Sequence, residues 1–243
     1  MAETATSDLE YVRQHREIWA LRPELRAVYH GLFATLLEAA GARRPIVELG
    51  AGPGFFHEYA PDSISTDLIF TPWVNVVCDG CRTPFHDSSA GAVVMLDVIH
   101  HLAKPLDFLA EMSRILAPGG RLVAIEPWIT APSYVLYRYF HHEDCALNID
   151  IAEPFRSTGK QAFDGNAAIP FQLVRHQRSQ PAAALKLIRC EPFPGLAYLA
   201  TLGFKRRRSV PGAAIRFAAR CERIAGPFGR WASTRALLVW EKR

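Results

Sequence analysis

No apolar stretch of this sequence approaches membrane-spanning length, because proline, arginine or histidine interrupts each one early. The N-terminal segment is polar and acidic and gives no sign of a secretory signal. Cysteine is scarce, and the five present lack the spacing of a disulfide framework, so we expect a reducing, cytoplasmic environment. Internal repeats and low-complexity tracts are missing as well. These absences exclude membrane-spanning, disulfide-stapled and fibrous proteins.

What is present is the composition of an ordinary globular protein. Of the 243 residues, 49% are apolar and 21% are charged, which suits one α/β domain over residues 1–243. The net charge of +4 is unevenly spread, with surplus acid in residues 1–100 and basic residues gathered in the last third, including the run 205–208. A basic end suits an anionic small molecule, a nucleic acid or a lipid surface, although a charge run is more often a solvated face.

The apolar pattern predicts helices that alternate with strands. Residues 8–40 carry apolar residues at helical spacing and predict two helices. Short apolar runs bounded by turn residues then predict seven strands, at 46–49, 63–66, 74–78, 92–96, 121–125, 186–190 and 236–240. Helical spacing recurs at 55–59, 105–116, 132–140, 196–202 and 213–225. Because these strands are apolar throughout, we expect a doubly wound, mostly parallel α/β sheet that is buried on both faces.

One stretch breaks this rhythm. Residues 128–184 are aromatic and rich in histidine, and we interpret them as an insertion after the fifth strand that covers an acceptor. The predicted domain therefore has four parts, namely N-terminal helices (1–44), a ligand-binding core (45–127), this cover (128–184), and closing strands and helices (185–243).

A glycine-rich loop directly follows the first predicted strand. Gly50, Gly52 and Gly54 allow the chain to turn sharply and to approach a ligand closely. A dinucleotide loop has the spacing Gly-x-Gly-x-x-Gly, whereas the spacing here is Gly-x-Gly-x-Gly. Glu48 stands two residues before the first glycine, where a carboxylate repels a pyrophosphate and favours a cationic ligand. The loop therefore indicates a nucleoside-type ligand that carries positive charge.

Three more acids end the next three predicted strands. Asp67 lies at about the distance at which such folds place the acid that binds ribose hydroxyls. Asp79 is suited to accept a hydrogen bond from an adenine amino group, and Asp97 faces the expected crevice. Each acid alone is more often a turn or cap residue. Because ligands of open α/β sheets bind at the carboxyl ends of the strands, we expect all four acids to converge on one site.

The span 46–127 resembles the class I S-adenosylmethionine-dependent methyltransferases, particularly the type 11 small-molecule group. The matching motifs are Val47-Glu48-Leu49-Gly50-Ala51-Gly52-Pro53-Gly54, Cys78-Asp79-Gly80, Pro84-Phe85, Asp97-Val98-Ile99-His100-His101-Leu102 and Arg114-Ile115-Leu116-Ala117-Pro118-Gly119-Gly120. The resemblance implies a Rossmann-like fold, S-adenosyl-L-methionine as cofactor and methyl transfer as the reaction.

The resemblance also implies the cofactor-binding residues. The positions carried over are Glu48, Gly50, Ala51, Gly52, Gly54, Asp67, Leu68, Asp79, Gly80 and Asp97. In related enzymes the N-terminal helices close over the cofactor, which assigns Tyr11 and Trp19 the same part; packing on the sheet edge is an equal alternative. One departure is that residues 68–73 are too few for the helix usually found after the second strand.

Histidines supply the candidate bases on the acceptor side. His100, His101 and His141 are candidates because histidine titrates near neutrality, although the first two are also common in type 11 enzymes of differing chemistry. The candidate substrate contacts are Trp128, Tyr137, His141, His142 and Phe163. Neighbouring side chains such as His141 and His142 rarely converge on one metal ion, so no metal ligand set is predicted.

We expect methylation of a small, possibly anionic molecule at a carboxyl or hydroxyl oxygen. The chain lacks the Asp/Asn-Pro-Pro-Tyr motif that resemblance associates with amide and exocyclic amine targets, which argues against a nucleic-acid partner. The alternatives are methylation at nitrogen or carbon, an RNA methyltransferase that uses the basic C-terminal third, a scaffold that binds the cofactor without turnover, and a nicotinamide oxidoreductase.

Overall fold

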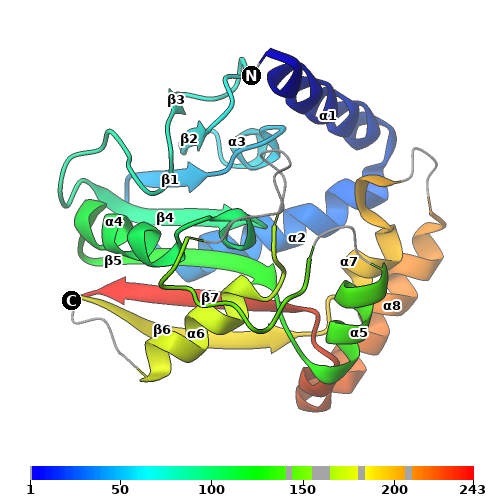
Figure 1. Cartoon of the computed structure of the whole chain (residues 1–243). Coiled ribbons are helices and arrows are strands. Elements are labelled where there is room, and N and C mark those ends of the chain that lie inside the picture. The colour runs from blue at the N-terminus through cyan, green and yellow to red at the C-terminus, as the bar shows by residue number, and fades with distance from the viewer. Residues whose placement is uncertain (1, 141–143, 155–164, 180–183, 206–209) are drawn as a thin grey trace.

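A seven-stranded sheet forms the centre of the computed structural model, which describes residues 2–140, 144–154, 165–179, 184–205 and 210–243 (Figure 1). The strands are β1 (Ile46–Leu49), β2 (Ile64–Asp67), β3 (Val76–Val77), β4 (Ala90–Leu96), β5 (Leu116–Pro127), β6 (Leu185–Phe193) and β7 (Arg235–Lys242), in the order β3-β2-β1-β4-β5-β7-β6. The pairs among β1 to β5 are parallel, whereas β7 is antiparallel to both β5 and β6. The predicted mostly parallel, seven-stranded α/β fold is confirmed.

Helices cover both faces of this sheet. α2 (Pro23–Ala40) packs against β4 and β5 on one face, and α4 (Pro105–Ile115) and α6 (Ile169–Ser179) pack on the other. The remaining elements are α1 (Ala2–Leu21), α3 (Phe55–Tyr59), α5 (Ala131–Phe140), α7 (Leu196–Thr201), α8 (Gly212–Ala225), η1 (Ile99–His101), η2 (Gly203–Lys205) and η3 (Gly226–Ala232). Figure 1 shows α5, α7 and α8 gathered at the end of the sheet to which the parallel strands point.

Alternate residues of the central strands fill two separate cores. In β4, Val93 and Met95 pack with α4 and α6, while Ala92 and Val94 pack with α2. Successive side chains of a strand point to opposite faces, so each strand must be apolar throughout when helices cover both faces. This is the physical reason that the strands could be recognised as uninterrupted apolar runs.

Several predicted boundaries were wrong. β5 begins at Leu116 rather than at residue 121, because Leu116 pairs with Ala90, so Pro118-Gly119-Gly120 belongs to the strand. β3 is shorter than residues 74–78, because the side chain of Asn75 instead accepts a hydrogen bond from the Ser65 N–H at 2.8 Å. Local patterns do not report these long-range pairings.

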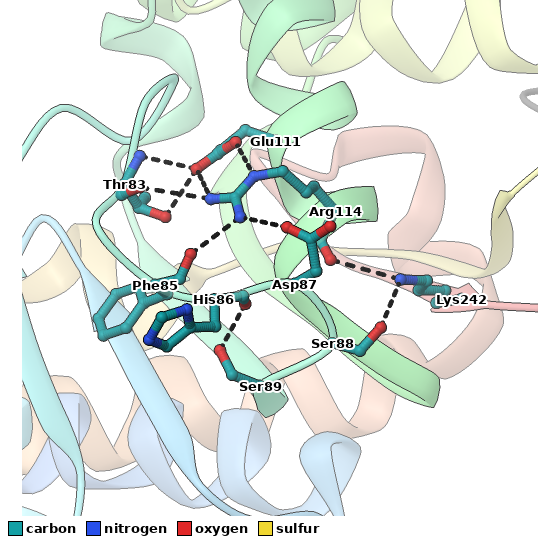
Figure 2. Close-up of polar contacts among 9 residues, drawn as sticks. All are labelled: Thr83, Phe85, His86, Asp87, Ser88, Ser89, Glu111, Arg114 and Lys242. Carbon is teal, nitrogen blue, oxygen red and sulfur yellow. Dashed lines mark hydrogen bonds and ion pairs between the residues drawn. The ribbon is translucent and has the colours of Figure 1, made fainter.

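A polar clamp fixes the loop that precedes β4 (Figure 2). Arg114, near the end of α4, donates to the Phe85 carbonyl at 2.9 Å and to the Asp87 carboxylate at 2.7 Å. It also hydrogen-bonds Glu111, which lowers the pKa of that carboxyl to about 2. Glu111 in turn accepts the Thr83 N–H at 2.7 Å. The clamp lies at the amino end of β4, where it holds the strand in register.

Candidate functional site

A cavity of about 800 Å³ opens at the carboxyl ends of the parallel strands. The loops after β1, β2 and β4 form one part of its wall, and side chains from α1, α2, α5, α7 and the start of β7 form the rest. Four acids at or near the carboxyl ends of β1, β2, β3 and β4 line this cavity, namely Glu48, Asp67, Asp79 and Asp97. The predicted candidates Gly50, Ala51, Gly52, Leu68 and Gly80 line it too.

The glycines of the loop after β1 serve two different purposes. Gly54 has a φ of +78°, and a Cβ there would collide with the Trp73 ring, so this glycine is required by packing. Gly52 has a φ of +48°, and a Cβ there would meet no atom within 4 Å. Gly52 lines the cavity, so a ligand can approach its Cα without meeting a side chain. Gly54 itself lies outside the part of the cavity wall formed by described residues.

Three side chains hold this loop in place. The Gly52 N–H donates to Asp67 Oδ2 at 2.7 Å, and the Trp73 indole N–H donates to the Gly52 carbonyl at 2.8 Å. Arg16 of α1 donates to the Pro53 carbonyl at 2.6 Å, and its guanidinium lies 4.3 Å from the centre of the Trp73 ring. Sequence reasoning missed Arg16 and Trp73, because no motif marks a contact from α1 or from the short β2–β3 connection.

Glu48 is the carboxyl group with the most unusual environment. Its side chain is buried, and its Oε2 has no hydrogen-bond partner among the described residues. Burial, and secondarily the nearby charge of Asp67, raises the pKa of Glu48 to about 8. A buried acceptor without a donor costs free energy until a donor arrives. The residues present therefore fit a ligand that brings a positively charged or N–H group to Glu48.

The carboxylates of Asp67 and Asp79 are fixed by backbone donors. The Ile69 N–H donates to Asp67 Oδ1 at 3.0 Å, and the Cys81 N–H donates to Asp79 Oδ1 at 2.8 Å. Residues 68–75 make this connection without a helix, as their small number predicted. Asp67 therefore ends β2 beside the glycine loop, at a place that suits ribose hydroxyls.

Asp97 is paired across the cavity floor. It has a φ of +59°, and its Oδ1 accepts a hydrogen bond from Arg235 Nη2 at 2.5 Å. The buried Arg235 guanidinium also lies 4.3 Å from the centre of the Tyr198 ring. Burial disfavours its charge, but Asp97, Tyr198 and Tyr137 together outweigh this and keep the pKa of Arg235 above its ordinary value. Sequence reasoning missed Arg235, although a charged residue directly before an apolar strand was a readable signal.

A second buried pair joins a predicted histidine to an acid that was not predicted. His100 Nδ1 lies 2.7 Å from Glu126 Oε2. The other oxygen of Glu126 accepts the N–H groups of Val98 and Ile99, both at 2.8 Å. Ligand atoms of Asp97, His100 and Glu126 lie within 4.8 Å of one another. Each of these three side chains already has a protein partner, so together they form a hydrogen-bonded network beside the cavity.

The start of the described segment 165–179 packs onto the two histidines. The Asn166 N–H donates to the His100 carbonyl at 2.8 Å, and a Cβ on Gly165 would lie 2.8 Å from His101 Nδ1. Both His100 and His101 line the cavity. The cover predicted after β5 therefore reaches the histidine pair. His141, His142 and Phe163 lie outside the described residues.

Aromatic residues from distant parts of the chain line the other end of the cavity. Tyr11 and Tyr137, both predicted, are part of the wall, and Tyr29, Tyr198 and Phe204, which were not predicted, join them. Of the other described candidates, Trp19 stacks on Phe55 at 3.9 Å and Trp128 packs against Phe171 at 5.2 Å, both outside the wall formed by the described residues. α1 thus lines the cavity with Tyr11, Gln14, His15 and Ile18, while its Trp19 packs against α3.

Within the described part of the chain, every helix is too short or too polar to cross a membrane.

A family model described as a methyltransferase domain matches residues 47–124. The chain is 39% identical over 51 residues to a probable tRNA methyltransferase 9B from Mus musculus, which covers 20% of this chain and 11% of the relative. It is 31% identical over 129 residues to a demethylmenaquinone methyltransferase from Beutenbergia cavernae, covering 43% of this chain and 51% of the relative. The chain therefore spans about half the length, or less, of the curated relatives it matches.

The fold is also similar to that of solved structures. A SAM-dependent methyltransferase from Archaeoglobus fulgidus superposes with a TM-score of 0.53 and 14% sequence identity, over 89% of this chain and 94% of that one. At this identity the similarity concerns the fold alone.

Proposed function

Because the chain contains a class I, type 11 S-adenosylmethionine-dependent methyltransferase domain, we propose that it methylates a small-molecule acceptor at a carboxyl or hydroxyl oxygen. The observation that carries the proposal is a single cavity that joins the glycine loop and its acids to an aromatic end. A site for the methyl donor and a site for an apolar acceptor thus share one enclosed space, as in-line transfer requires.

The donor end has the chemistry of S-adenosylmethionine. Glu48 would face the cationic amino group, Gly52 offers open backbone, and Asp67 is placed for the ribose hydroxyls. When bound, the cofactor supplies an electrophilic methyl group on a positively charged sulfur. The enzyme must therefore chiefly orient the acceptor and exclude water.

The acceptor end favours a moderately apolar molecule that carries an acidic group. Tyr29, Tyr137, Tyr198 and Phe204 give it an aromatic wall. Arg235 is buried and paired with Asp97, and its Nε has no hydrogen-bond partner among the described residues, so it is available to an acidic group of the acceptor. An acceptor acid paired near Arg235 would lie beside the histidines of η1.

We assign the base to His100, with Glu126 as its positioning residue. A carboxylate at Nδ1 fixes the tautomer of the imidazole and stabilises the imidazolium that forms when the ring takes a proton. The proton of the acceptor hydroxyl moves to His100 while its oxygen gains the methyl group. His101 is the alternative base, and His141 stays a sequence prediction outside the described residues.

The test is methyl transfer from radiolabelled S-adenosylmethionine to matched sets of carboxylic acids, phenols and amines of similar size. We expect labelled esters or ethers and one S-adenosylhomocysteine per methyl group transferred. Transfer confined to amines would contradict the oxygen assignment, and cofactor binding without transfer to any set would identify a scaffold. Binding of NADH in place of S-adenosylmethionine would exclude the methyltransferase proposal.

Variants of the two buried partners test the base. His100→Asn is expected to lower kcat by about a hundredfold, the usual contribution of general base catalysis. Glu126→Gln is expected to leave the KM for cofactor near that of the wild type and to shift the acidic limb of the kcat profile to lower pH, because it removes the charge that favours the imidazolium. If His101→Asn reproduces the loss and His100→Asn does not, the base is His101.

The five cysteines are all free, which supports a reducing, cytoplasmic compartment as part of this proposal.

A further inference from the structure

The three most exposed large apolar residues of the described chain, Ile224, Phe228 and Trp231, lie where its surface is also basic. In α8, Phe217 and Ile224 are 70% and 75% exposed; in η3, Phe228 and Trp231 are 84% and 83% exposed. We define this region, residues 212–232, as the α8–η3 surface. Large apolar side chains that remain this exposed on two contacting elements mark an interaction site.

The charge of the surface complements one class of partner. Arg216, Arg220, Arg223 and Arg230 are all exposed, and Arg216, Arg220 and Arg223 form no ion pair with a carboxylate among the described residues. The lone acid, Glu222, points inward and accepts the Gly195 N–H at 2.9 Å. The face therefore presents positive charge only.

The spacing of these residues is that of a helix that lies flat on a surface. Phe217 and Ile224 are two turns apart and project from one side of α8, opposite the buried Ile215. Arg220 lies between them on that side, and the chain then continues into Phe228 and Trp231. An amphipathic helix with aromatic and aliphatic anchors among arginines binds in the interface of an anionic membrane.

The position of the surface links it to the cavity. α8 packs on α7, and η3 packs on α5. α5 in turn exposes Tyr139 and Phe140, and Phe140 also lines the cavity. Figure 1 shows these helices together at the cavity end of the sheet.

From the exposed anchors and the unbalanced arginines, we propose that the α8–η3 surface docks the protein on an anionic lipid bilayer, with the cavity beside the membrane. This inference stands independently of methyl transfer. It predicts that a lipophilic molecule in the bilayer has a short path along α5 to the cavity.

The test is co-sedimentation of the full chain with vesicles of phosphatidylcholine alone and of phosphatidylcholine with a quarter phosphatidylglycerol. We expect binding to the anionic vesicles, weakened by added salt. The variant R216A/R220A/R223A is expected to bind about a hundredfold more weakly, because each arginine near an anionic surface contributes about fivefold. The variant F217S/I224S is expected to bind at least tenfold more weakly at every salt concentration.

Matched controls separate docking from a general loss of charge or apolar surface. Phe70→Ser removes a phenylalanine that is 71% exposed near β2, and Arg178→Ala removes an exposed arginine of α6. Both are expected to bind like the wild type. All variants should keep the melting temperature of the wild type, because the replaced side chains are exposed.

Two results would overturn the proposal. Equal binding of F217S/I224S and wild-type protein would reduce the surface to a solvated basic face. Tighter binding to single-stranded RNA than to anionic vesicles at the same salt concentration, unaffected by F217S/I224S, would assign the surface to nucleic acid.

Discussion

The two ends of the cavity are built in different ways. The donor end is formed by the loops after β1, β2 and β3, so its residues lie between positions 48 and 80. The acceptor end combines residues as distant in sequence as Tyr11, Tyr198 and Arg235. The donor end can therefore be recognised as a sequence motif, because its residues are close together along the chain. The acceptor end is assembled only by long-range packing.

The two ends also differ in how their charges are balanced. Glu48 at the donor end is buried without a cationic partner among the described residues, while Asp97 at the acceptor end is paired with Arg235. A buried carboxyl group without a cationic partner is stabilised when a ligand supplies one. The Asp97–Arg235 ion pair needs no ligand to balance its charge. The donor end is thus expected to depend on its ligand, and the acceptor end to depend on its own internal contacts.

The largest effect is expected from breaking the balanced pair. Arg235→Met leaves Asp97 without its cation, and we expect a loss of about 3 kcal/mol in the free energy of unfolding. Urea denaturation measures this loss. The double variant D97N/R235M should be less destabilised than the sum of the two single variants, because neither partner is then left unpaired. Strictly additive losses would show that the pair does not organise the acceptor end.

The next effect concerns the open backbone at the donor end. Gly52→Ala is expected to weaken S-adenosylmethionine binding by about tenfold, or about 1.4 kcal/mol, because the new methyl group occupies ligand space. Isothermal calorimetry measures the affinity. Gly119→Ala is the matched control, since Gly119 also has a positive φ (+73°) and open space around it. Equal affinities in the two variants would remove Gly52 from the ligand site.

The unbalanced carboxyl predicts a pH dependence of stability without cofactor. The pKa of Glu48 is about 8 in the folded chain, above that of an unfolded glutamate, so the folded state holds its proton more tightly. The contribution of Glu48 to the free energy of unfolding is fully present below pH 4.5 and is lost as the pH rises from 4.5 to about 8. Burial lowers the pKa of His15 to about 4, which opposes this trend only below about pH 6.5.

The contribution of Glu48 is tested across the window from pH 6.5 to 8 by comparison with Glu48→Gln, which leaves the histidines of the chain unchanged. Thermal unfolding of the wild type should show decreasing stability across it, and Glu48→Gln should show a flatter profile. A wild-type profile that rises with pH in this window would contradict the assigned pKa shift.

The smallest effect is expected where α1 holds the glycine loop. Arg16→Ala removes the contacts to the Pro53 carbonyl and to Glu58, which are partly exposed. We expect the KM for S-adenosylmethionine to rise about threefold, with a change in stability below about 1 kcal/mol. Arg13→Ala is the control, because Arg13 pairs only with the exposed Glu10. If both variants behave alike, α1 does not support the loop.

The same contrast explains what sequence alone could predict. The strands of the sheet were predictable from their apolar runs. The glycine loop and the acids at the strand ends were predictable because each follows such a run within a few residues. Arg235 was marked locally only as a charged residue before an apolar strand, and its pairing was not predictable because Asp97 lies 138 positions away. Glu126 was not assigned to the site, since nothing local shows that it meets His100. Gly54 was assigned to the ligand, but its contact with the Trp73 ring requires tertiary structure.

The central claim is that Glu48 awaits the cation of the methyl donor, and its most direct test counts protons. Calorimetry of S-adenosylmethionine binding at pH 7, in buffers of different ionisation enthalpy, gives the protons released per ligand bound. We predict that the wild type releases about 0.9 proton more than Glu48→Gln, because a carboxyl of pKa about 8 is mostly protonated until the ligand ionises it. Equal proton release and equal affinity in the two proteins would contradict the claim.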